Sequence, residues 1–182
     1  ARFLVGEIKA VSGLLKTFNR SRTDRSGKTE SVTADEANCA LVEFEDGAVG
    51  TLESAGISTG RKNQCTWEIS GSKGSIAFDL EDLNHLQVCL QEGRTGAVHG
   101  FTKVSVTGPH HPEQSMILPP GHNSGWEDGH LHALHHFLDA VMHGRSVEPG
   151  GATFEDGYRV QVVMEAIAES SRTGKRLEVS FK

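Results

Sequence analysis

The sequence has 182 residues, 36% of them hydrophobic and 23% charged, which is the composition of a globular chain long enough to bury its own core. Its formal net charge of −6 argues against nucleic acid as a partner, and no apolar run approaches the roughly 20 residues that a membrane span needs. The three cysteines are widely spaced and never form C-x-x-C, which excludes a disulfide scaffold and a cysteine zinc site and fits a reducing, cytoplasmic compartment.

The first third of the chain is predicted to be mostly β-strand. Ile8–Phe18 shows an imperfect apolar alternation that favours a strand. Ala37–Phe44 and Ala48–Leu52 flank Glu45-Asp46-Gly47, and Asp-Gly between two such runs indicates a hairpin because a type I′ turn needs positive φ at both central residues. Residues 20–28 hold four cations and one anion, and they are interpreted either as a solvated connection or as an anion site.

A second group of strands is predicted between residues 65 and 106. Trp67 and Ile69 alternate with polar residues, and Gly71-Ser72-Lys73-Gly74 marks a turn before further short alternating runs. Since each strand has one apolar and one more polar face, the sheet is predicted to be largely antiparallel. The same glycines do not have P-loop spacing, and no G-x-G occurs in the chain, so a Rossmann fingerprint is absent.

Two helices are predicted near the end of the chain. Apolar residues recur at helical spacing over Trp126–Met142. A second helix is predicted to begin at Thr153, with Asp156 in its first turn, and to end at Gly174 before a short last strand. Its predicted apolar face consists of Tyr158, Val162, Val163, Ala166 and Ile167. Strands followed by helices predict an α+β fold, a largely antiparallel open-faced sheet with helices packed on one face.

Histidine is the residue type in this sequence that is most able to bind a metal or to act in catalysis. His132 and His136 lie one helical turn apart, a spacing that binds Zn²⁺ or Ni²⁺ but that also occurs on ordinary polar helix faces. His130 falls on the apolar stripe instead, as a hydrogen-bonded core residue or as a catalyst. No nucleophile–base pair is identified, so no catalytic residue is assigned.

Four side chains are candidates for binding a polar ligand. His122, in an aperiodic stretch over 110–124, and Trp126 suit a sugar, because an indole stacks on a ring face and an imidazole bonds to hydroxyls; a packed surface loop is the alternative. Arg61 and Asn63 are candidates for contacting a polyol or a partner subunit, or they simply begin a solvated strand.

Short motifs spread over nearly the whole chain carry a resemblance to a known family. They are Val5-Gly6-Glu7-Ile8, Asp35-Glu36-Ala37, Phe44-Glu45-Asp46-Gly47-Ala48-Val49-Gly50, Gly60-Arg61-Lys62-Asn63, Glu68-Ile69-Ser70-Gly71-Ser72-Lys73-Gly74, Pro119-Pro120-Gly121-His122, Trp126-Glu127-Asp128 and Phe154-Glu155-Asp156-Gly157. In this order they are similar to the C-terminal domain of the Gfo/Idh/MocA (glucose–fructose oxidoreductase, inositol dehydrogenase) family. Residues 1–182 are therefore interpreted as a single C-terminal substrate-binding and oligomerisation domain.

The resemblance implies a two-domain parent, an NAD(P)-dependent oxidoreductase acting on a sugar, polyol or related hydroxyl compound. In that family a Rossmann domain precedes this one, binds NAD or NADP and carries a catalytic lysine. Ala1–Gly6 resembles the tail of the short helix that follows the family's catalytic histidine. The catalytic residues are thus expected upstream of residue 1, with no cofactor or metal bound by this chain, which is expected to be inactive alone.

The resemblance also suggests roles for surfaces of this chain. Arg61, Asn63, His122 and Trp126 are the expected substrate contacts, and the open sheet face is expected to form a homodimer or tetramer. Two alternatives stay open: a stand-alone, non-enzymatic dimerisation or ligand-binding module, and a histidine metal-binding domain.

Overall fold

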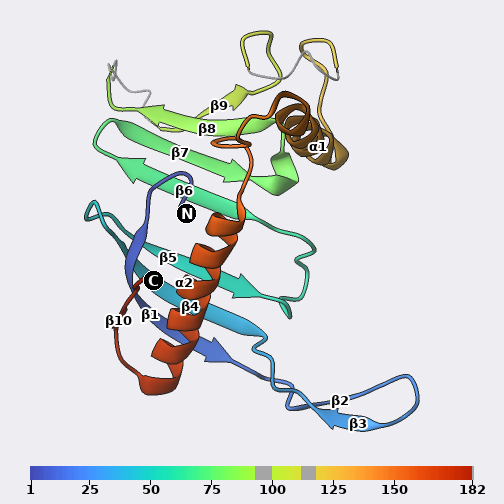
Figure 1. Cartoon of the computed structure of the whole chain (residues 1–182), viewed down its shortest axis with the longest axis vertical. Helices are drawn as coiled ribbons and strands as arrows, with labels where there is room; N and C mark the ends of the chain where they lie inside the picture. The colour runs from blue at the N-terminus through green and yellow to red at the C-terminus, as the bar shows by residue number, and fades with distance from the viewer. Residues whose placement is uncertain (93–99, 112–117, 182) are drawn as a thin grey trace. The chain divides into compact units, whose positions relative to one another are not determined.

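The computed structural model describes residues 1–92, 100–111 and 118–181 (Figure 1). They group into two compact units, one made of Ala1–Thr59 with Ala152–Lys182 and the other of Gly60–Gly151. This grouping does not test the interpretation of the chain as a single domain, which stays a prediction. No helix in the described part of the chain has the length and apolar character needed to span a membrane.

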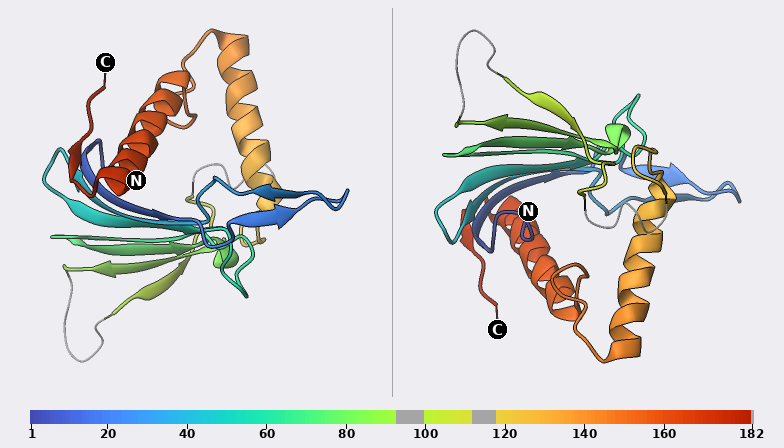
Figure 2. Two further views of the ribbon diagram at one scale, coloured as in Figure 1. Left: turned by 90° about the horizontal axis from the view of Figure 1, so that it is seen from below. Right: turned by 90° about the horizontal axis from the view of Figure 1, so that it is seen from above.

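The first unit is built on a four-stranded antiparallel sheet in the order β10-β1-β4-β5. Helix α2 lies along one face of this sheet, and no other helix of the unit covers the opposite face (Figure 2). The elements are β1 (Ile8–Lys16), β4 (Ala37–Phe44), β5 (Val49–Ala55), β10 (Leu177–Glu178) and α2 (Phe154–Thr173).

The hairpin between β4 and β5 forms where the Asp-Gly pair predicts it, but its turn differs. The loop has three residues, closed by the Phe44 N–H donating to the Ala48 carbonyl at 2.9 Å and the Gly47 N–H donating to the Phe44 carbonyl at 3.1 Å. Gly47 adopts a φ of 92°, which a residue with a side chain rarely takes. This is the three-residue hairpin loop that needs glycine in its last position, instead of a two-residue type I′ turn.

The core of the first unit lies between the sheet and α2. Ile8, Val11, Val42 and Phe44 from the strands meet Val163 from the helix, and all five are 5% exposed or less. Val163 belongs to the apolar face that the sequence predicts for this helix. Burial of this face is the main source of stability for the helix, since propensity alone contributes little.

A glycine in β1 lets α2 approach the sheet closely. A Cβ at Gly13 would lie 2.5 Å from the carbonyl oxygen of Ile167, so a larger residue would push the helix away. The Gly13 N–H donates to the buried Ser170 hydroxyl at 2.9 Å, and this hydroxyl donates to the Lys175 carbonyl at 2.6 Å. Strand, helix and helix end are thereby joined at one point.

The polar segment after β1 is a hairpin, which sequence reasoning did not predict. Strands β2 (Ser21–Thr23) and β3 (Thr29–Ser31) pair in antiparallel fashion, and every residue in them is exposed. The Asp24 carboxylate shapes the turn by accepting the N–H groups of Ser26 at 2.8 Å and Lys28 at 3.0 Å.

The second unit contains a four-stranded antiparallel sheet in the order β6-β7-β8-β9 and one long helix, α1. Its apolar alternation places Trp67, Phe78, Leu86 and Val104 opposite one another on one face of the sheet. The elements are β6 (Thr66–Gly71), β7 (Gly74–Asp79), the 3₁₀ turn η1 (Leu80–Asp82), β8 (His85–Leu90), β9 (Thr102–Ser105) and α1 (Trp126–His143).

The α+β class, the antiparallel strand pairing and the absence of a Rossmann fold from this chain are confirmed. All strand pairs of the described residues are antiparallel, and α2 covers one face of its sheet as predicted. The strands divide into two four-stranded sheets and a hairpin, whereas the sequence pattern predicts one sheet. Part of the aperiodic stretch at 110–124 lies outside the described residues.

Candidate functional site

A buried carboxylate ties the loop after β1 to the start of β4. The Glu36 side chain is 5% exposed, and its Oε2 accepts the N–H groups of Phe18 and Asn19, both at 2.7 Å. Its Oε1 accepts the Asn19 side-chain amide at 2.9 Å and the Arg22 guanidinium at 2.6 Å. The carboxylate therefore fixes the base of the β2–β3 hairpin.

These donors also keep Glu36 ionised. The Asn19 backbone N–H, the Asn19 side chain and then Arg22 lower the pKa of Glu36 from 4.5 to about 2, against the opposing effect of burial. A carboxylate with so low a pKa and all its donors supplied by the protein is a poor general acid or base at neutral pH. Glu36 thus has a structural role.

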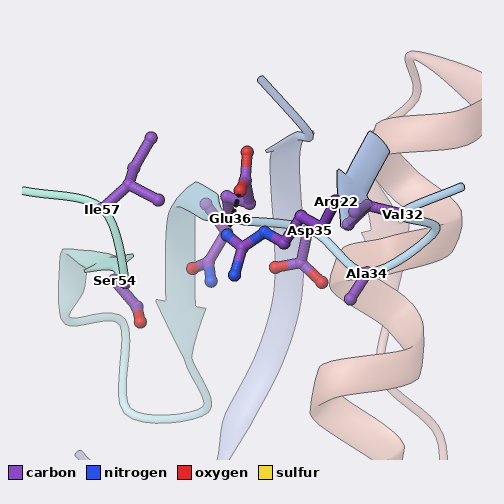
Figure 3. Close-up of a pocket in the computed structure, with 9 residues that line it drawn as sticks. Arg22, Val32, Ala34, Asp35, Glu36, Ser54 and Ile57 are labelled. Atoms are coloured by element: carbon purple, nitrogen blue, oxygen red, sulfur yellow. Dashed lines mark hydrogen bonds and ion pairs between the residues drawn. The ribbon is translucent and has the colours of Figure 1, made fainter. Parts of the chain in front are cut away.

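A pocket of about 380 Å³ lies beside Glu36 in the first unit (Figure 3). Figure 3 shows Arg22, Asp35 and Glu36 grouped at its centre. It is lined by Arg22, Val32, Ala34, Asp35, Glu36, Asn38, Ser54, Gly56 and Ile57. The lining offers hydrogen-bond donors and acceptors but neither histidine nor cysteine.

Sequence reasoning named Glu36 within a family motif but predicted neither its burial nor this pocket. The available signal was an acidic residue directly before a strand, together with the cluster of cations at 20–28, one of which reaches it. Of the two interpretations of that segment, an exposed connection describes most of it, since Arg22 is bound to a carboxylate of the same unit.

Arg61 and Asn63, two of the predicted substrate contacts, lie in the loop before β6. The Arg61 guanidinium is 3.6 Å from the Glu81 carboxylate, and both side chains are about half exposed. Asn63 is exposed in the same loop.

His122 and Trp126, the other two, lie four residues apart where the chain enters α1. His122 Nδ1 is 3.0 Å from the Pro119 carbonyl oxygen. Trp126 is 60% exposed, and its ring lies edge-on to that of His130 at 4.3 Å between centroids. His130 is itself exposed, so its predicted core position is wrong. The role of all four residues in substrate binding stays a prediction.

Among the remaining histidines of α1, His143 has an ion-pair partner. Asp139 binds His143, at 3.0 Å, and Arg145. His132 and His136 are half-buried. Within the described ranges no three His, Cys, Asp or Glu side chains converge as metal ligands would. The geometry therefore lends the metal-binding interpretation no support.

An ion-pair network holds the first residues of the chain to the start of α2. The Arg2 guanidinium forms a bidentate ion pair with the Glu7 carboxylate, at 2.7 and 3.0 Å, and a further hydrogen bond to the Asp156 carboxylate at 3.1 Å. Arg159 lies 3.3 Å from the same Glu7 carboxylate, and these guanidinium groups, Arg2 first, lower the pKa of Glu7. Asp156 also caps α2, because its carboxylate accepts the Thr153 N–H at 2.9 Å.

Comparison with known proteins gives consistent matches over the whole chain. The family described as "Oxidoreductase family, C-terminal alpha/beta domain", the Gfo/Idh/MocA family, matches residues 1–179. Levoglucosan dehydrogenase of Pseudarthrobacter phenanthrenivorans is 34% identical over an alignment of 185 residues that covers 94% of this chain and 46% of that protein.

Solved structures agree with this result. Levoglucosan dehydrogenase in complex with NADH and L-sorbose matches with a TM-score of 0.91 and 34% identity, over 100% of this chain and 47% of its own. An oxidoreductase domain protein from Kribbella flavida matches with a TM-score of 0.86 and 37% identity, over 96% of this chain and 45% of its own. The chain thus spans about half the length of these relatives. It belongs, as a C-terminal α/β domain, to the Gfo/Idh/MocA oxidoreductase family, as its sequence motifs predict.

Proposed function

We propose that this chain is the substrate-binding and oligomerisation domain of an NAD(P)-dependent oxidoreductase that acts on a sugar or a related hydroxyl compound. The observation that carries the proposal is the similarity over the whole chain, at 34% identity, to levoglucosan dehydrogenase. Solved complexes of that relative hold NADH together with levoglucosan or with L-sorbose.

The proposed division of labour follows from the chemistry. Oxidising a hydroxyl requires a base for its proton while hydride leaves carbon for the nicotinamide, which supplies the redox chemistry when bound. The family resemblance assigns the base and the nucleotide site to a preceding domain. This chain would contribute orientation, through the guanidinium of Arg61, the amide of Asn63, the imidazole of His122 and the indole of Trp126.

The uncovered face of the first sheet supports the oligomerisation role. Leu14, Leu41 and Val49 lie on the face opposite α2 and are 64%, 62% and 79% exposed. Neighbouring apolar side chains on an open sheet face mark an association surface in soluble proteins. In a dimer or tetramer, a second copy of the chain related by two-fold symmetry would cover this face.

The proposal is tested on the longer gene product that it implies. With levoglucosan, L-sorbose and a panel of other sugars, we expect NAD⁺ or NADP⁺ to be reduced, followed as absorbance of the reduced nicotinamide. Trp126→Ala should raise KM for the sugar about tenfold or more while the affinity for the nucleotide is kept, because loss of a stacking ring removes substrate contacts alone.

Two controls accompany this assay. The 182-residue chain alone is expected to reduce neither nucleotide. Phe154→Ala removes a fully exposed aromatic ring elsewhere and should leave KM unchanged. Turnover by the chain alone, or no turnover with any sugar by the longer protein, contradicts the proposal.

A further inference from the structure

The β2–β3 hairpin extends away from the four-stranded sheet of the first unit (Figures 1 and 2). It is a sheet of two strands, so each strand has an edge that pairs with no other strand among the described residues. Every residue of both strands is exposed. A two-stranded hairpin on its own is only marginally stable in water, because it buries little apolar surface. The hairpin therefore needs support from its base or from a partner.

The base of the hairpin is firmly held. The buried Glu36 carboxylate binds the Arg22 guanidinium of β2 at 2.6 Å, together with backbone groups of the preceding loop. The Thr17 hydroxyl donates to the Ala34 carbonyl at 3.0 Å, which joins the segments that enter and leave the hairpin. A carboxylate is costly to bury unless it is fully paired, and a simple connection between two strands does not require one. The base thus fixes the direction in which the hairpin extends.

The tip of the hairpin carries a cation that the described residues do not neutralise. Residues 20–31 contain four cations and two carboxylates, in a chain whose formal net charge is −6. Arg22 and Lys28 each bind a carboxylate, at 2.6 and 2.5 Å. Arg20 at the base and Arg25 in the loop at the tip form no ion pair within the described part of the chain. The tip is therefore suited to an acidic surface.

The base of the hairpin offers the opposite charge. Asp35 is exposed and lines the pocket of about 380 Å³, and its carboxylate has no hydrogen bond or ion pair to any described residue. Next to it, Glu36 and Arg22 compensate each other's charge (Figure 3). The pocket thus keeps one uncompensated negative charge, and a guanidinium is the group that binds a carboxylate best. Arg25 of the same chain lies at the other end of the hairpin.

We propose that the β2–β3 hairpin is an arm that binds a second copy of this chain, with Arg25 at its tip against Asp35 at the base of that copy's hairpin. Two hairpins related by a two-fold axis lie antiparallel, so the tip of each meets the base of the other and every contact occurs twice. The same arrangement brings unpaired strand edges together, which can then share backbone hydrogen bonds.

This surface is separate from the open face of the four-stranded sheet, so the inference goes beyond the proposed function. A chain with one two-fold interface forms a dimer, whereas two different two-fold interfaces generate a tetramer. With the open sheet face as one interface and the hairpin as the other, the longer gene product is expected to be a tetramer.

A charge exchange between tip and base tests the contact. The longer gene product carries Leu41→Asp, which places a charge on the open sheet face, and its self-association is measured by sedimentation velocity over a concentration series. We expect it to remain a dimer. Adding Arg25→Asp sets two carboxylates against each other and should raise the dissociation constant at least about tenfold, and adding Asp35→Arg instead should do the same with two guanidiniums. Both substitutions together should restore the original constant, because the pair is then reversed.

Arg20→Asp is the matched control. It makes the same change of charge in the same hairpin, at an exposed arginine that also lacks an ion pair within the described residues. At the base, however, the new carboxylate would face Arg25 of the second copy, so the association should not weaken. If net charge alone governed the association, Arg20→Asp and Arg25→Asp would weaken it equally. High salt should weaken the association of the Leu41→Asp protein, since the contact is between exposed charges.

Three results would overturn the inference: a monomeric Leu41→Asp protein, a double exchange that associates no more tightly than the single variants, or an Arg20→Asp variant weakened as much as Arg25→Asp. These results are independent of the sugar assay. A longer protein that reduces NAD⁺ with a sugar but fails the charge exchange refutes only the hairpin contact. One that passes the exchange but uses no nicotinamide refutes the proposed activity and keeps the contact.

Discussion

The two long helices of this chain are similar in length and opposite in their surroundings. Helix α2 has 20 residues and α1 has 18, and both have an apolar stripe and a glycine in left-handed conformation after the last turn. Helix α2 places Val163 in the core, 5% exposed, and hydrogen-bonds through Ser170 to β1. Helix α1 has one buried residue, Ala140, and its large apolar side chains are in solvent.

This difference separates what a helix needs for its own fold from what it offers to another molecule. The stripe of α2 is matched by a sheet in the same unit, with a glycine at the closest approach, so the pair is complete. Among the described residues of its own unit, no strand packs extensively along α1. Apolar residues at helical spacing are therefore evidence of burial in the working assembly, which can be larger than the chain that carries them.

The same negative charge should have very different effects on the apolar faces of the two helices. In the 182-residue chain, Val163→Asp should cost at least about 3 kcal/mol, because it buries an unpaired carboxylate in the core. Leu134→Asp should cost no more than about 1 kcal/mol, because the side chain is 55% exposed and the change mainly lowers helix propensity. Urea unfolding followed by circular dichroism measures both. A large loss in Leu134→Asp would show that α1 is packed within the chain after all.

The sequence predicted the features that depend on neighbouring residues. The Thr153 cap, the apolar face of α2 and the Gly174 end are all confirmed. Caps and helical periodicity depend only on residues within about 20 positions of one another, so the sequence alone can indicate them. The β4–β5 hairpin was located by its Asp-Gly pair for the same reason. Helix α1 was also predicted, but the spacing of its apolar residues does not indicate which part of the protein packs against them.

The features that were missed depend on contacts between distant residues. Strands β2 and β3, three residues each with the sequences SRT and TES, have no apolar alternation and are stabilised by pairing with each other. The burial of Glu36 arises from donors 14 to 18 residues away, and an acidic residue is expected on the surface unless such partners are known. The four predicted substrate contacts remain untested for the same reason, because a ligand site is a meeting of separate segments.

A second experiment tests, by varying the pH, how the Glu36 carboxylate stabilises the first unit. Because the pKa of Glu36 is lowered from 4.5 to about 2 by folding, its contribution to stability is present above about pH 4.5 and is lost as the pH falls towards 2. Glu36→Gln keeps the size of the side chain but replaces one acceptor oxygen by an NH₂ group, which donates and does not accept hydrogen bonds. The N–H groups of Phe18 and Asn19 and the other donors around residue 36 must then share a single acceptor oxygen. The variant should be less stable at pH 7, and the deficit should shrink as the pH approaches 2.

Urea unfolding of the variant and the parent chain between pH 7 and pH 2.5 measures this deficit. Glu30→Gln is the control, since Glu30 is 62% exposed and its only ion pair given by the described residues is with the equally exposed Lys28. Its effect should be small at every pH. A Glu36→Gln deficit of constant size across this range would mean that the carboxylate charge is not what holds the hairpin base.

The smallest expected effect concerns how the two helices begin. The Thr153 hydroxyl accepts the Asp156 N–H at 3.2 Å, whereas the N-cap of α1 is Gly125, which has no side chain for this bond. Thr153→Ala should therefore cost about 1 kcal/mol, and Gly125→Ser should gain a few tenths by supplying a hydroxyl. Gly125 adopts an ordinary extended conformation, with φ of −98°, and the nearest atom to an added Cβ is the mobile end of Glu127, at 2.8 Å. If the serine also fails to raise the helical content of the chain, measured by circular dichroism, then α1 is limited by its missing partner surface and not by its cap.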